Sequence, residues 1–333
     1  MRVLLTGATG FLGRVLARRL VEAGHAVAAL VRERDVALAE LGIEELRGDI
    51  TQLDAATGAV AGREIVVHTA ARVAPFGRVD DYYDANVRGT DNLLAACEIA
   101  GVRKFVFTSC AGVVLDHGDL NGVNESQRMP AEAPTPYLAT KALAERHVLA
   151  ANGPSLATVA LRPHFLWGPG EPRWLPRIAA LAKSGRLRLF GEPGKKIDSC
   201  YVDNAADAHV AAVERLAPAS PIAGKAYFIT QGEPASIDGF VNGLLRAAGY
   251  PATEIRRVSG TVARMLASTA PLRRAVTRSD PLLTTDALTL FGQSAWFNIA
   301  AARRDLGYAP RVGMSEGLSR VSAYLARERM RGR

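Results

Sequence analysis

Two residues suited to proton transfer stand four positions apart in the segment PYLATK at residues 136–141. The segment opens an apolar-periodic stretch that predicts a helix to about Ala151, and side chains four apart share one face of a helix. A phenol has a pKa of about 10 and is a poor base at neutral pH, but a nearby positive charge favours its ionised form. The pair therefore predicts acid/base catalysis, with Tyr137 exchanging the proton and Lys141 tuning it. An ordinary amphipathic helix is the alternative interpretation.

The opening residues 1–20 read as a strand, a glycine turn and a helix. A short apolar run leads into Gly7, Gly10 and Gly13, and apolar residues with helical period follow. Gly7 permits a tight turn, Gly10 lets a diphosphate approach the backbone, and Gly13 lets the helix sit close to the sheet. The helix amides and dipole then face the anion. Glycines alone are weak evidence, but the strand before and the helix after them indicate a dinucleotide site.

The second predicted strand, residues 26–31, bears on the choice of cofactor. NAD-preferring proteins of this kind carry an acidic residue near the end of this strand to bind the ribose hydroxyls. This chain has Val31 there, followed by Arg32. An arginine suits a 2′-phosphate, so we favour NADP(H). NAD(H) stays open, because Glu33 is able to bind a ribose and Arg32 can equally be a solvated loop residue.

Later strands also end in residues that suit a cofactor. The strand at residues 65–68 closes into Thr69, Ala70 and Ala71, whose small side chains leave space beside a ligand. Asp49 stands where its carboxylate would meet an adenine amino group, and a helix cap is the alternative role.

Strands alternating with long helices predict the fold class: α/β, with a parallel, doubly wound Rossmann sheet. Ligands of such sheets lie beyond the carboxyl ends of the strands. The strand at 104–108 ends in Thr108, Ser109 and Cys110, which are therefore candidates for chemistry.

Eight motifs along the chain resemble those of the extended short-chain dehydrogenase/reductases, of the NAD-dependent epimerase/dehydratase superfamily. They are TGATGFLG at 6–13, GDI at 48–50, HTAA at 68–71, NVRGT at 86–90, FTSCAGV at 107–113, YLATK at 137–141, LRPHFLWGPGEP at 161–172 and YVDNAADAH at 201–209. The stretches at 161–172, 224–230 and 297–310 are most similar to the 3β-hydroxysteroid dehydrogenase branch. That branch includes sterol-4α-carboxylate 3-dehydrogenases and is similar to the 2-alkyl-3-oxoalkanoate reductases.

The resemblance implies a Rossmann domain over residues 1–165, to which segments near 197–232 return, and a smaller substrate-binding portion over 166–333. It implies that Tyr137 is the catalytic acid/base and that Lys141 also holds the nicotinamide ribose. The predicted cofactor-binding residues are Gly7, Thr9, Gly10, Phe11, Leu12, Gly13, Arg32, Asp49, Ile50, Thr69, Ala70, Ala71, Asn86, Thr108, Tyr137, Lys141, Pro163 and Phe165.

Cys110 departs from the family pattern, because the family usually has a serine there that hydrogen-bonds the substrate oxygen. A thiol is a weak donor and a poor acceptor. Three explanations stay open: Cys110 does the work of the serine, Thr108 or Ser109 does it, or the site has lost activity. Strand alternation puts Thr108 on the same side as Cys110, which favours Thr108 over Ser109. We expect catalysis, because the Tyr137 pair remains.

The composition is that of an ordinary globular protein, with 333 residues of which 48% are hydrophobic and 22% charged. The net charge is +8, but the arginines are scattered and form no basic stripe, so we expect no nucleic-acid partner. The chain enters a strand at once and has no apolar run long enough to span a bilayer, which predicts a cytoplasmic protein. The cysteines, Cys97, Cys110 and Cys200, predict neither a disulfide framework nor a metal site.

Two further contacts are predicted. Residues 260–276 mix apolar and arginine side chains, so they predict a basic amphipathic helix that permits peripheral membrane contact. Packing over a domain or at a dimer contact is the alternative. The resemblance implies a homodimer that packs through the helices at 79–100 and 137–151.

Together these features predict an NAD(P)-dependent dehydrogenase/reductase. It would interconvert a secondary alcohol and a ketone on a large apolar substrate, of the 3β-hydroxysteroid, sterol-4-carboxylate or 2-alkyl-3-oxo acid type. One alternative is a nucleotide-sugar epimerase or dehydratase, against which Phe165, Leu166 and Trp167 argue mildly. The other is a non-catalytic NAD(P)-sensing protein, which only Cys110 supports.

Overall fold

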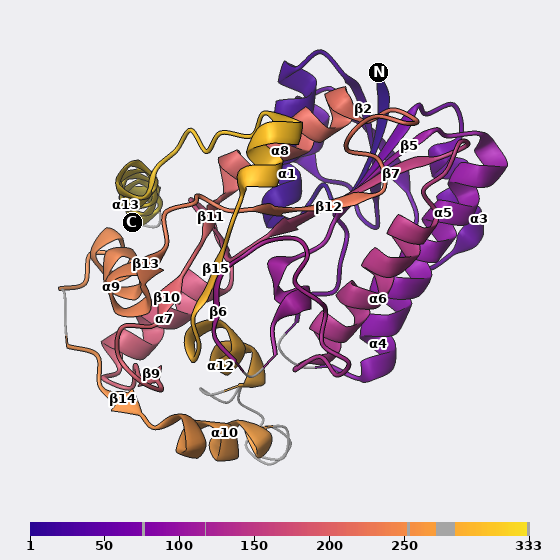
Figure 1. Cartoon of the computed structure of the whole chain (residues 1–333). Coiled ribbons are helices and arrows are strands. Elements are labelled where there is room, and N and C mark those ends of the chain that lie inside the picture. Colours follow the sequence, from indigo (N-terminus) through magenta and orange to yellow (C-terminus); the bar gives the residue numbers. More distant parts are fainter. Residues whose placement is uncertain (75–76, 117, 252–253, 271–283, 332–333) are drawn as a thin grey trace.

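The computed structural model describes residues 1–74, 77–116, 118–251, 254–270 and 284–331 (Figure 1). A large parallel sheet flanked by helices is built mainly from the first half of the chain. Short strands and helices, mainly from the second half, pack beyond one end of this sheet.

The large sheet has seven strands, and every neighbouring pair in it is parallel. In spatial order the strands are β12 (Lys225–Ile229), β7 (Ala157–Pro163), β5 (Lys104–Thr108), β4 (Ile65–His68), β1 (Arg2–Thr6), β2 (Ala26–Val31) and β3 (Glu44–Arg47). The strand order reverses at β1 and β4, and such a switch point is where doubly wound sheets bind ligands. The predicted fold class is confirmed.

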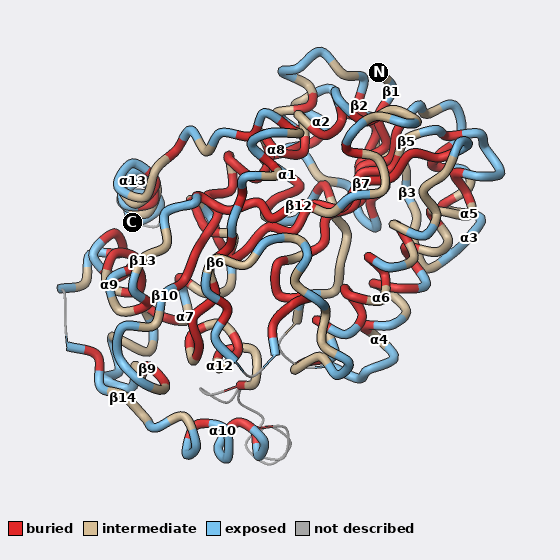
Figure 2. Tube along the Cα trace, viewed as in Figure 1, coloured by how far each residue is buried: buried red, intermediate tan, exposed pale blue. Residues whose placement is uncertain are grey.

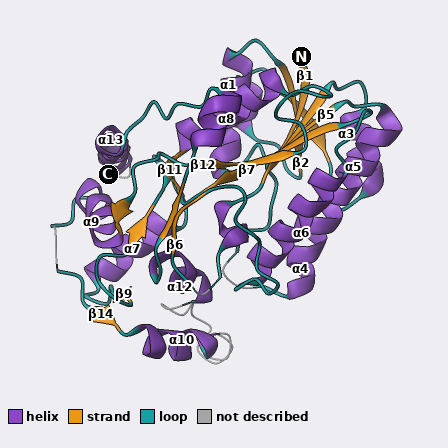
Figure 3. Ribbon diagram, viewed as in Figure 1, coloured by secondary structure: helices purple, strands orange, loops and turns teal. Residues whose placement is uncertain are grey.

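Helices cover both faces of the large sheet (Figure 3), and alternate residues of the central strands pack against the two layers. Val3 and Leu5 belong to one buried core, and Leu4 between them belongs to another. Because both faces are covered, the central strands read as continuous apolar runs. The layers are α1 (Phe11–Glu22) and α8 (Val202–Arg215) on one face, and α3 (Leu53–Val60), α5 (Gly89–Ala100) and α6 (Pro136–Ala150) on the other.

Helix α6, which carries the predicted acid/base pair, is fixed at both ends. The Thr135 hydroxyl accepts the Leu138 N–H at 3.3 Å, and Pro136 occupies the first turn. Further along, Arg162 of β7 donates through Nε to both carboxylate oxygens of Glu145 at 3.0 Å. This ion pair is almost fully buried, so it ties the helix firmly to the sheet.

The helix predicted over 79–100 contains an irregular turn. It consists of α4 (Val79–Tyr83), a π-helical turn at Asp84–Arg88, and α5. Such turns re-aim side chains and are frequent at functional sites. Here the turn contains Asn86.

The smaller part of the molecule packs around a buried aromatic cluster. Figure 2 shows buried stretches of chain in this part. Phe165 meets Phe240 edge to face at 5.2 Å, and Trp167 meets Tyr201 in the same way at 5.3 Å. Its strands are β6 (Leu120–Val123), β8 (Leu166–Trp167), β9 (Leu189–Phe190), β10 (Lys196–Ile197), β11 (Cys200–Tyr201), β13 (Ala235–Ser236), β14 (Arg257–Val258) and β15 (Ala295–Phe297). Its helices are α7 (Trp174–Lys183), α9 (Ile237–Ala247), α10 (Gly260–Ser268), α12 (Thr285–Phe291) and α13 (Met314–Arg331). Short helical segments complete the described elements: α2 (Val36–Glu40), a 3-10 turn at Ala111–Val114 and a π turn at Ala302–Leu306.

The chain crosses between the two parts more than once. Strand β12 and helix α8, from the predicted returning segments, belong to the large sheet and its covering layer. Strand β6, from the first half of the chain, pairs with β15 in the smaller part. The domain boundary at residue 165 stays a prediction.

Helix α10 covers only the first half of the segment predicted to be amphipathic. It exposes Val262, Met265 and Leu266. Residues 271–276 of that segment, with Leu272, Arg273 and Arg274, lie outside the described residues. Among the described helices, none combines the length and the apolar character needed to cross a membrane.

Three histidines are buried inside the fold. The two ring nitrogens of His68 each meet a threonine hydroxyl, at 2.6 and 3.0 Å. His209 Nε2 lies 2.8 Å from the Thr108 hydroxyl, and His164 Nδ1 donates to the Asp198 carbonyl oxygen at 2.7 Å. Burial lowers the pKa of His68 to about 3 and that of the other two histidines to about 4.

We expect the free energy of unfolding to fall as the pH drops from 6.5 towards 4. Unfolded histidines titrate near pH 6.5, so in this window the unfolded chain binds more protons and stability rises with pH. Asp198 offsets part of this effect, because burial raises its pKa to about 6. A net uptake of about two protons gives a slope on the order of 2 kcal/mol per pH unit near pH 5. Denaturant titrations at several pH values measure it, and a flat profile would contradict neutral buried histidines.

Candidate active site

The turn after β1 allows a ligand to approach the backbone closely. Gly7 has φ of +72°, and a Cβ at this position would lie 2.5 Å from the amide nitrogen of Ala70. A Cβ on Gly13 would lie 1.9 Å from the Gly7 carbonyl oxygen. Gly10 begins α1, whose first turn has no acidic residue and, among the described residues, no capping side chain. Its open N–H groups therefore fit the diphosphate of a dinucleotide.

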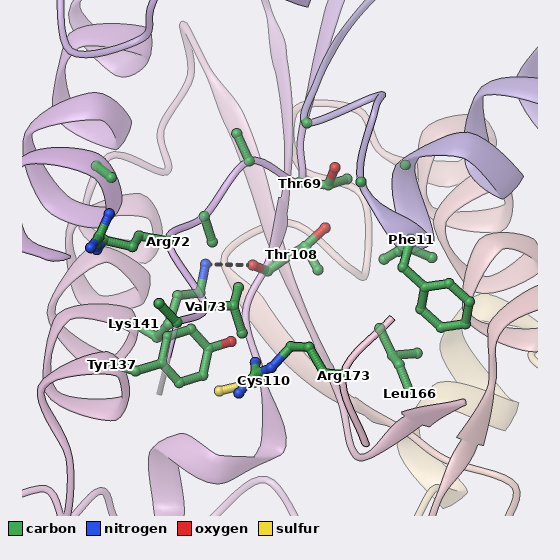
Figure 4. Close-up of a pocket in the computed structure, with 18 of the residues that line it drawn as sticks. Phe11, Thr69, Arg72, Val73, Thr108, Cys110, Tyr137, Lys141, Leu166 and Arg173 are labelled. Carbon is green, nitrogen blue, oxygen red and sulfur yellow. Dashed lines mark hydrogen bonds between the residues drawn. The ribbon is translucent and has the colours of Figure 1, made fainter. Parts of the chain in front are cut away.

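This turn borders a cavity of about 670 Å³ that lies beyond the carboxyl ends of the large sheet (Figure 4). All the predicted site residues except Asn86 line it. They are Gly7, Thr9, Gly10, Phe11, Leu12, Gly13, Arg32, Asp49, Ile50, Thr69, Ala70, Ala71, Thr108, Cys110, Tyr137, Lys141, Pro163 and Phe165.

Arg32 and Asp49 border the cavity at the ends of neighbouring strands. Arg32 is exposed, and its carbonyl oxygen accepts a hydrogen bond from Arg47 Nη2 at 3.3 Å. A second arginine, which the sequence did not single out, therefore lies beside the first. Asp49 uses Oδ1 to accept the backbone N–H and the hydroxyl of Thr51, both at 2.9 Å. Its other carboxylate oxygen is left for a ligand such as adenine.

Asn86 is not among the residues that line the cavity, so its contact with the cofactor stays a prediction. Its side-chain oxygen accepts the Arg72 N–H at 2.7 Å, and its amide group donates to the Thr140 hydroxyl at 3.0 Å. The π-helical turn aims this side chain at the loop after β4 and at α6, so it holds the cavity wall from behind.

Lys141 extends under the floor of the site. It is 2% exposed, its Nζ donates to the Thr108 carbonyl oxygen at 2.7 Å, and it lies 4.0 Å from the centre of the Phe107 ring. Burial lowers the pKa of Lys141 to about 8. The ammonium therefore joins α6 to the end of β5 and loses its proton more readily than an exposed lysine.

Tyr137 and Cys110 lie close to each other at the reaction end of the cavity (Figure 4), and each acts on the pKa of the other. Burial and the neighbouring thiol raise the pKa of Tyr137 well above its ordinary value of 10. Arg173 is the cation that acts against this rise. The sequence predicted a lowered pKa. The structure differs because burial of the phenol outweighs the nearby charge.

Thr108, Ser109 and Cys110, the three candidates for the hydrogen bond to the substrate oxygen, differ in their surroundings. The Thr108 hydroxyl, favoured by strand alternation, bonds instead to His209 on the opposite side of the sheet from α6. The Ser109 hydroxyl is buried and, within the described chain, has no hydrogen-bond partner. Only the Cys110 side chain meets Tyr137. Of the three, Cys110 is therefore the one whose side chain lies beside the phenol.

The far wall of the cavity comes from residues that the sequence did not suggest. The chief ones are Glu171, Arg173 and Trp174, at the start of α7, and Asp286 and Leu290 of α12. They lie more than a hundred residues apart in the chain. Glu171 had a usable signal, since GPGEP stands before an apolar-periodic stretch and an acidic residue there favours a helix start.

These features define an α/β protein with a cavity that joins the glycine turn after β1 to Tyr137 and Cys110. Comparison with known proteins agrees. Residues 4–258 match the model of the 3-beta hydroxysteroid dehydrogenase/isomerase family. The chain belongs to this family, and it is an NAD(P)-dependent dehydrogenase/reductase that acts on hydroxyl or keto groups.

The similar proteins include both sequence relatives and solved structures. A 2-alkyl-3-oxoalkanoate reductase of Stenotrophomonas maltophilia is 43% identical, over 97% of this chain and 99% of the relative. A sterol-4-alpha-carboxylate 3-dehydrogenase of Schizosaccharomyces pombe is 32% identical, over 99% of both chains. The structure of a Thermus thermophilus UDP-glucose 4-epimerase in complex with NAD shares the fold, with a TM-score of 0.72 and 23% identity over 98% of this chain and 99% of that one.

The close contact at Gly13 gives a direct test of the dinucleotide turn. We expect Gly13→Ala to lower the unfolding free energy by about 2 kcal/mol or more, because the methyl group collides with a backbone carbonyl. Dinucleotide affinity should fall at least about tenfold. Thermal melts and cofactor titration by fluorescence measure both. Gly58→Ala is the matched control, since a Cβ there meets nothing within 4 Å in helix α3. Equal behaviour of the two variants would contradict the assigned turn.

Proposed function

We propose that this chain transfers hydride reversibly between a nicotinamide cofactor and the alcohol or ketone carbon of a large, apolar acid. The observation that carries the proposal is the meeting of Tyr137 and Cys110 at the end of a cavity that continues from the dinucleotide turn. The names of the Stenotrophomonas and Schizosaccharomyces relatives support it. Each describes a carboxylate on the carbon next to the reacting carbon.

Tyr137 is the proton carrier in this mechanism. In oxidation its phenolate takes the proton of the substrate hydroxyl, and in reduction the phenol returns a proton to the carbonyl oxygen. The Cys110 thiol, beside it, holds the same oxygen. When bound, the nicotinamide supplies or accepts the hydride. Lys141, held by the Thr108 carbonyl, would bind the nicotinamide ribose and favour the ionised phenol.

We infer that NADP(H) is the preferred cofactor. Arg32 borders the end of the cavity where a 2′-phosphate would bind, and a guanidinium group suits a phosphate. Arg47 adds positive charge beside it, since its guanidinium group donates to the Arg32 carbonyl oxygen. NADPH is the usual reductant of cells, so this preference favours reduction of the ketone. A cytoplasmic location, a role in lipid metabolism, peripheral membrane contact and a homodimer stay predictions.

Removal of the phenol hydroxyl tests the mechanism. We expect Tyr137→Phe to lower turnover by about 100-fold or more, because no other group supplies the proton at that position. Cofactor affinity should stay within about threefold, since the ring remains. The assay follows nicotinamide absorbance with a 2-alkyl-3-oxo acid, and with 3β-hydroxysterols with and without a 4-carboxylate. Retained turnover would contradict the role of Tyr137. No turnover of any substrate by the unmodified chain would favour a sugar-nucleotide enzyme.

A second substitution tests the cofactor preference. We expect Arg32→Ala to raise the KM for NADPH at least about tenfold and to leave the KM for NADH unchanged, because the lost contact is to the 2′-phosphate alone. Arg34→Ala is the control, because Arg34 is an exposed neighbour that does not line the cavity. Equal use of NADH and NADPH by the unmodified chain would overturn the preference.

A further inference from the structure

Arg173 brings a positive charge to the reaction end of the cavity. Arg173, Cys110 and Tyr137 all line this end of the cavity (Figure 4). The residue precedes helix α7, so it reaches the site from the smaller part of the molecule rather than from the large sheet. Its charge acts on the Tyr137 phenol against the effect of burial. A group on the substrate that lies next to the reacting oxygen would therefore meet this cation.

The neighbouring carboxylate of Glu171 is already engaged. Its two oxygens accept the backbone N–H groups of Arg173, Trp174 and Leu175, all at 2.8 Å. These bonds cap helix α7 and fix the position from which the arginine side chain extends. Glu171 is 8% exposed, so the cap is shielded from water. It positions Arg173 without neutralising the guanidinium.

The Arg173 guanidinium has N–H groups that are available to a ligand. Its carbon lies 5.5 Å from the centre of the Trp174 ring, a contact that leaves the N–H groups at its edge open. Within the part of the chain that the structure describes, no ion pair or hydrogen bond of this guanidinium is present. Arg173 is also only partly exposed. An incompletely solvated cation without a partner favours an anionic ligand.

Asp286 is an acidic residue whose charge raises the pKa of Tyr137, against the effect of Arg173. Thr135, the residue that caps α6, lies close to its carboxylate. Burial raises the pKa of Asp286, and the charge of Arg173 opposes this rise. The charges of the two side chains thus interact, yet among the described residues they form no ion pair within 4.0 Å. Asp286 therefore leaves the terminal N–H groups of Arg173 available for a ligand.

We propose that Arg173 binds the substrate carboxylate and makes the site selective for acids that carry this group on the carbon next to the reacting carbon. The inference rests on the proposed function and adds the recognition element to it. A guanidinium presents two parallel N–H donors that match the two oxygens of a carboxylate. In a 3-oxo or 3-hydroxy acid, one carbon separates the carboxylate from the reacting carbon. The oxygen held by Tyr137 therefore brings the carboxylate to Arg173.

The test compares an acid with its uncharged methyl ester. The substrates are a 2-alkyl-3-oxo acid and its methyl ester, assayed with NADPH. We expect Arg173→Gln to lower kcat/KM for the acid by about 30-fold or more, since a charged hydrogen-bonding pair is lost. The ester should change by less than about threefold. Arg173→Lys keeps the positive charge but loses the two parallel N–H donors. Its kcat/KM for the acid should therefore lie between the values of the unmodified chain and of Arg173→Gln. Lys183→Gln removes an equal charge from the exposed end of the same helix and should change neither substrate.

Equal losses for the acid and the ester would overturn the proposal, because Arg173 would then act on Tyr137 and not on the carboxylate. An unchanged acid would overturn it too. A binding measurement keeps the test independent of turnover: calorimetry with a stable 2-alkyl-3-hydroxy acid in the presence of NADP⁺. The unmodified chain should bind this acid at least about tenfold tighter than Arg173→Gln does, even if no substrate turns over. Failure of turnover alone therefore counts against the proposed function, and equal binding counts against the carboxylate site. Thermal melts confirm that each variant is folded.

Discussion

The site depends on one buried charge, the ammonium of Lys141. Burying an ammonium costs several kcal/mol unless strong acceptors surround it. Here the Thr108 carbonyl oxygen at 2.7 Å and the face of the Phe107 ring at 4.0 Å supply that environment. The same bond joins helix α6 to the end of strand β5, so it fixes Tyr137 relative to Cys110. The cost appears as a pKa of about 8 for the lysine, and strongly shifted groups of this kind gather at functional sites.

The two ends of the cavity rely on different physics. At the nucleotide end backbone N–H groups would bind the ligand, so residues without side chains are needed. The turn requires Gly7 and Gly13 because a Cβ at either position would collide with backbone atoms. At the reaction end side chains do the binding, and burial sets their protonation. A phenol whose pKa is raised stays protonated in neutral solution and suits proton donation to a ketone. The cation that opposes this effect, Arg173, comes from the smaller part of the molecule, so the substrate chamber and the chemistry are coupled.

The sequence predicted the elements whose signals are local. The strand, turn and helix around Gly7 to Gly13, the sheet type, and the helix with Tyr137 and Lys141 follow from periodicity and spacing. Contacts between distant segments could not be predicted in this way. The Thr108 hydroxyl hydrogen-bonds to His209 on α8. The Asn86 side chain, which sits in a π-helical turn, bonds to the Arg72 backbone and does not line the cavity. Arg173 and Asp286 meet only because the smaller part folds back over the sheet, and no spacing rule connects residues so far apart in the chain.

The central claim is that hydride moves between the nicotinamide and the carbon whose oxygen contacts Tyr137. The most direct test is to reduce a 2-alkyl-3-oxo acid with NADPH that carries deuterium at the transferable position. The position of the label in the product is then read by mass spectrometry and NMR. The account predicts one deuterium, on the carbinol carbon, and none on the neighbouring carbon that bears the alkyl chain. A product without deuterium, or label on any other carbon, would contradict it.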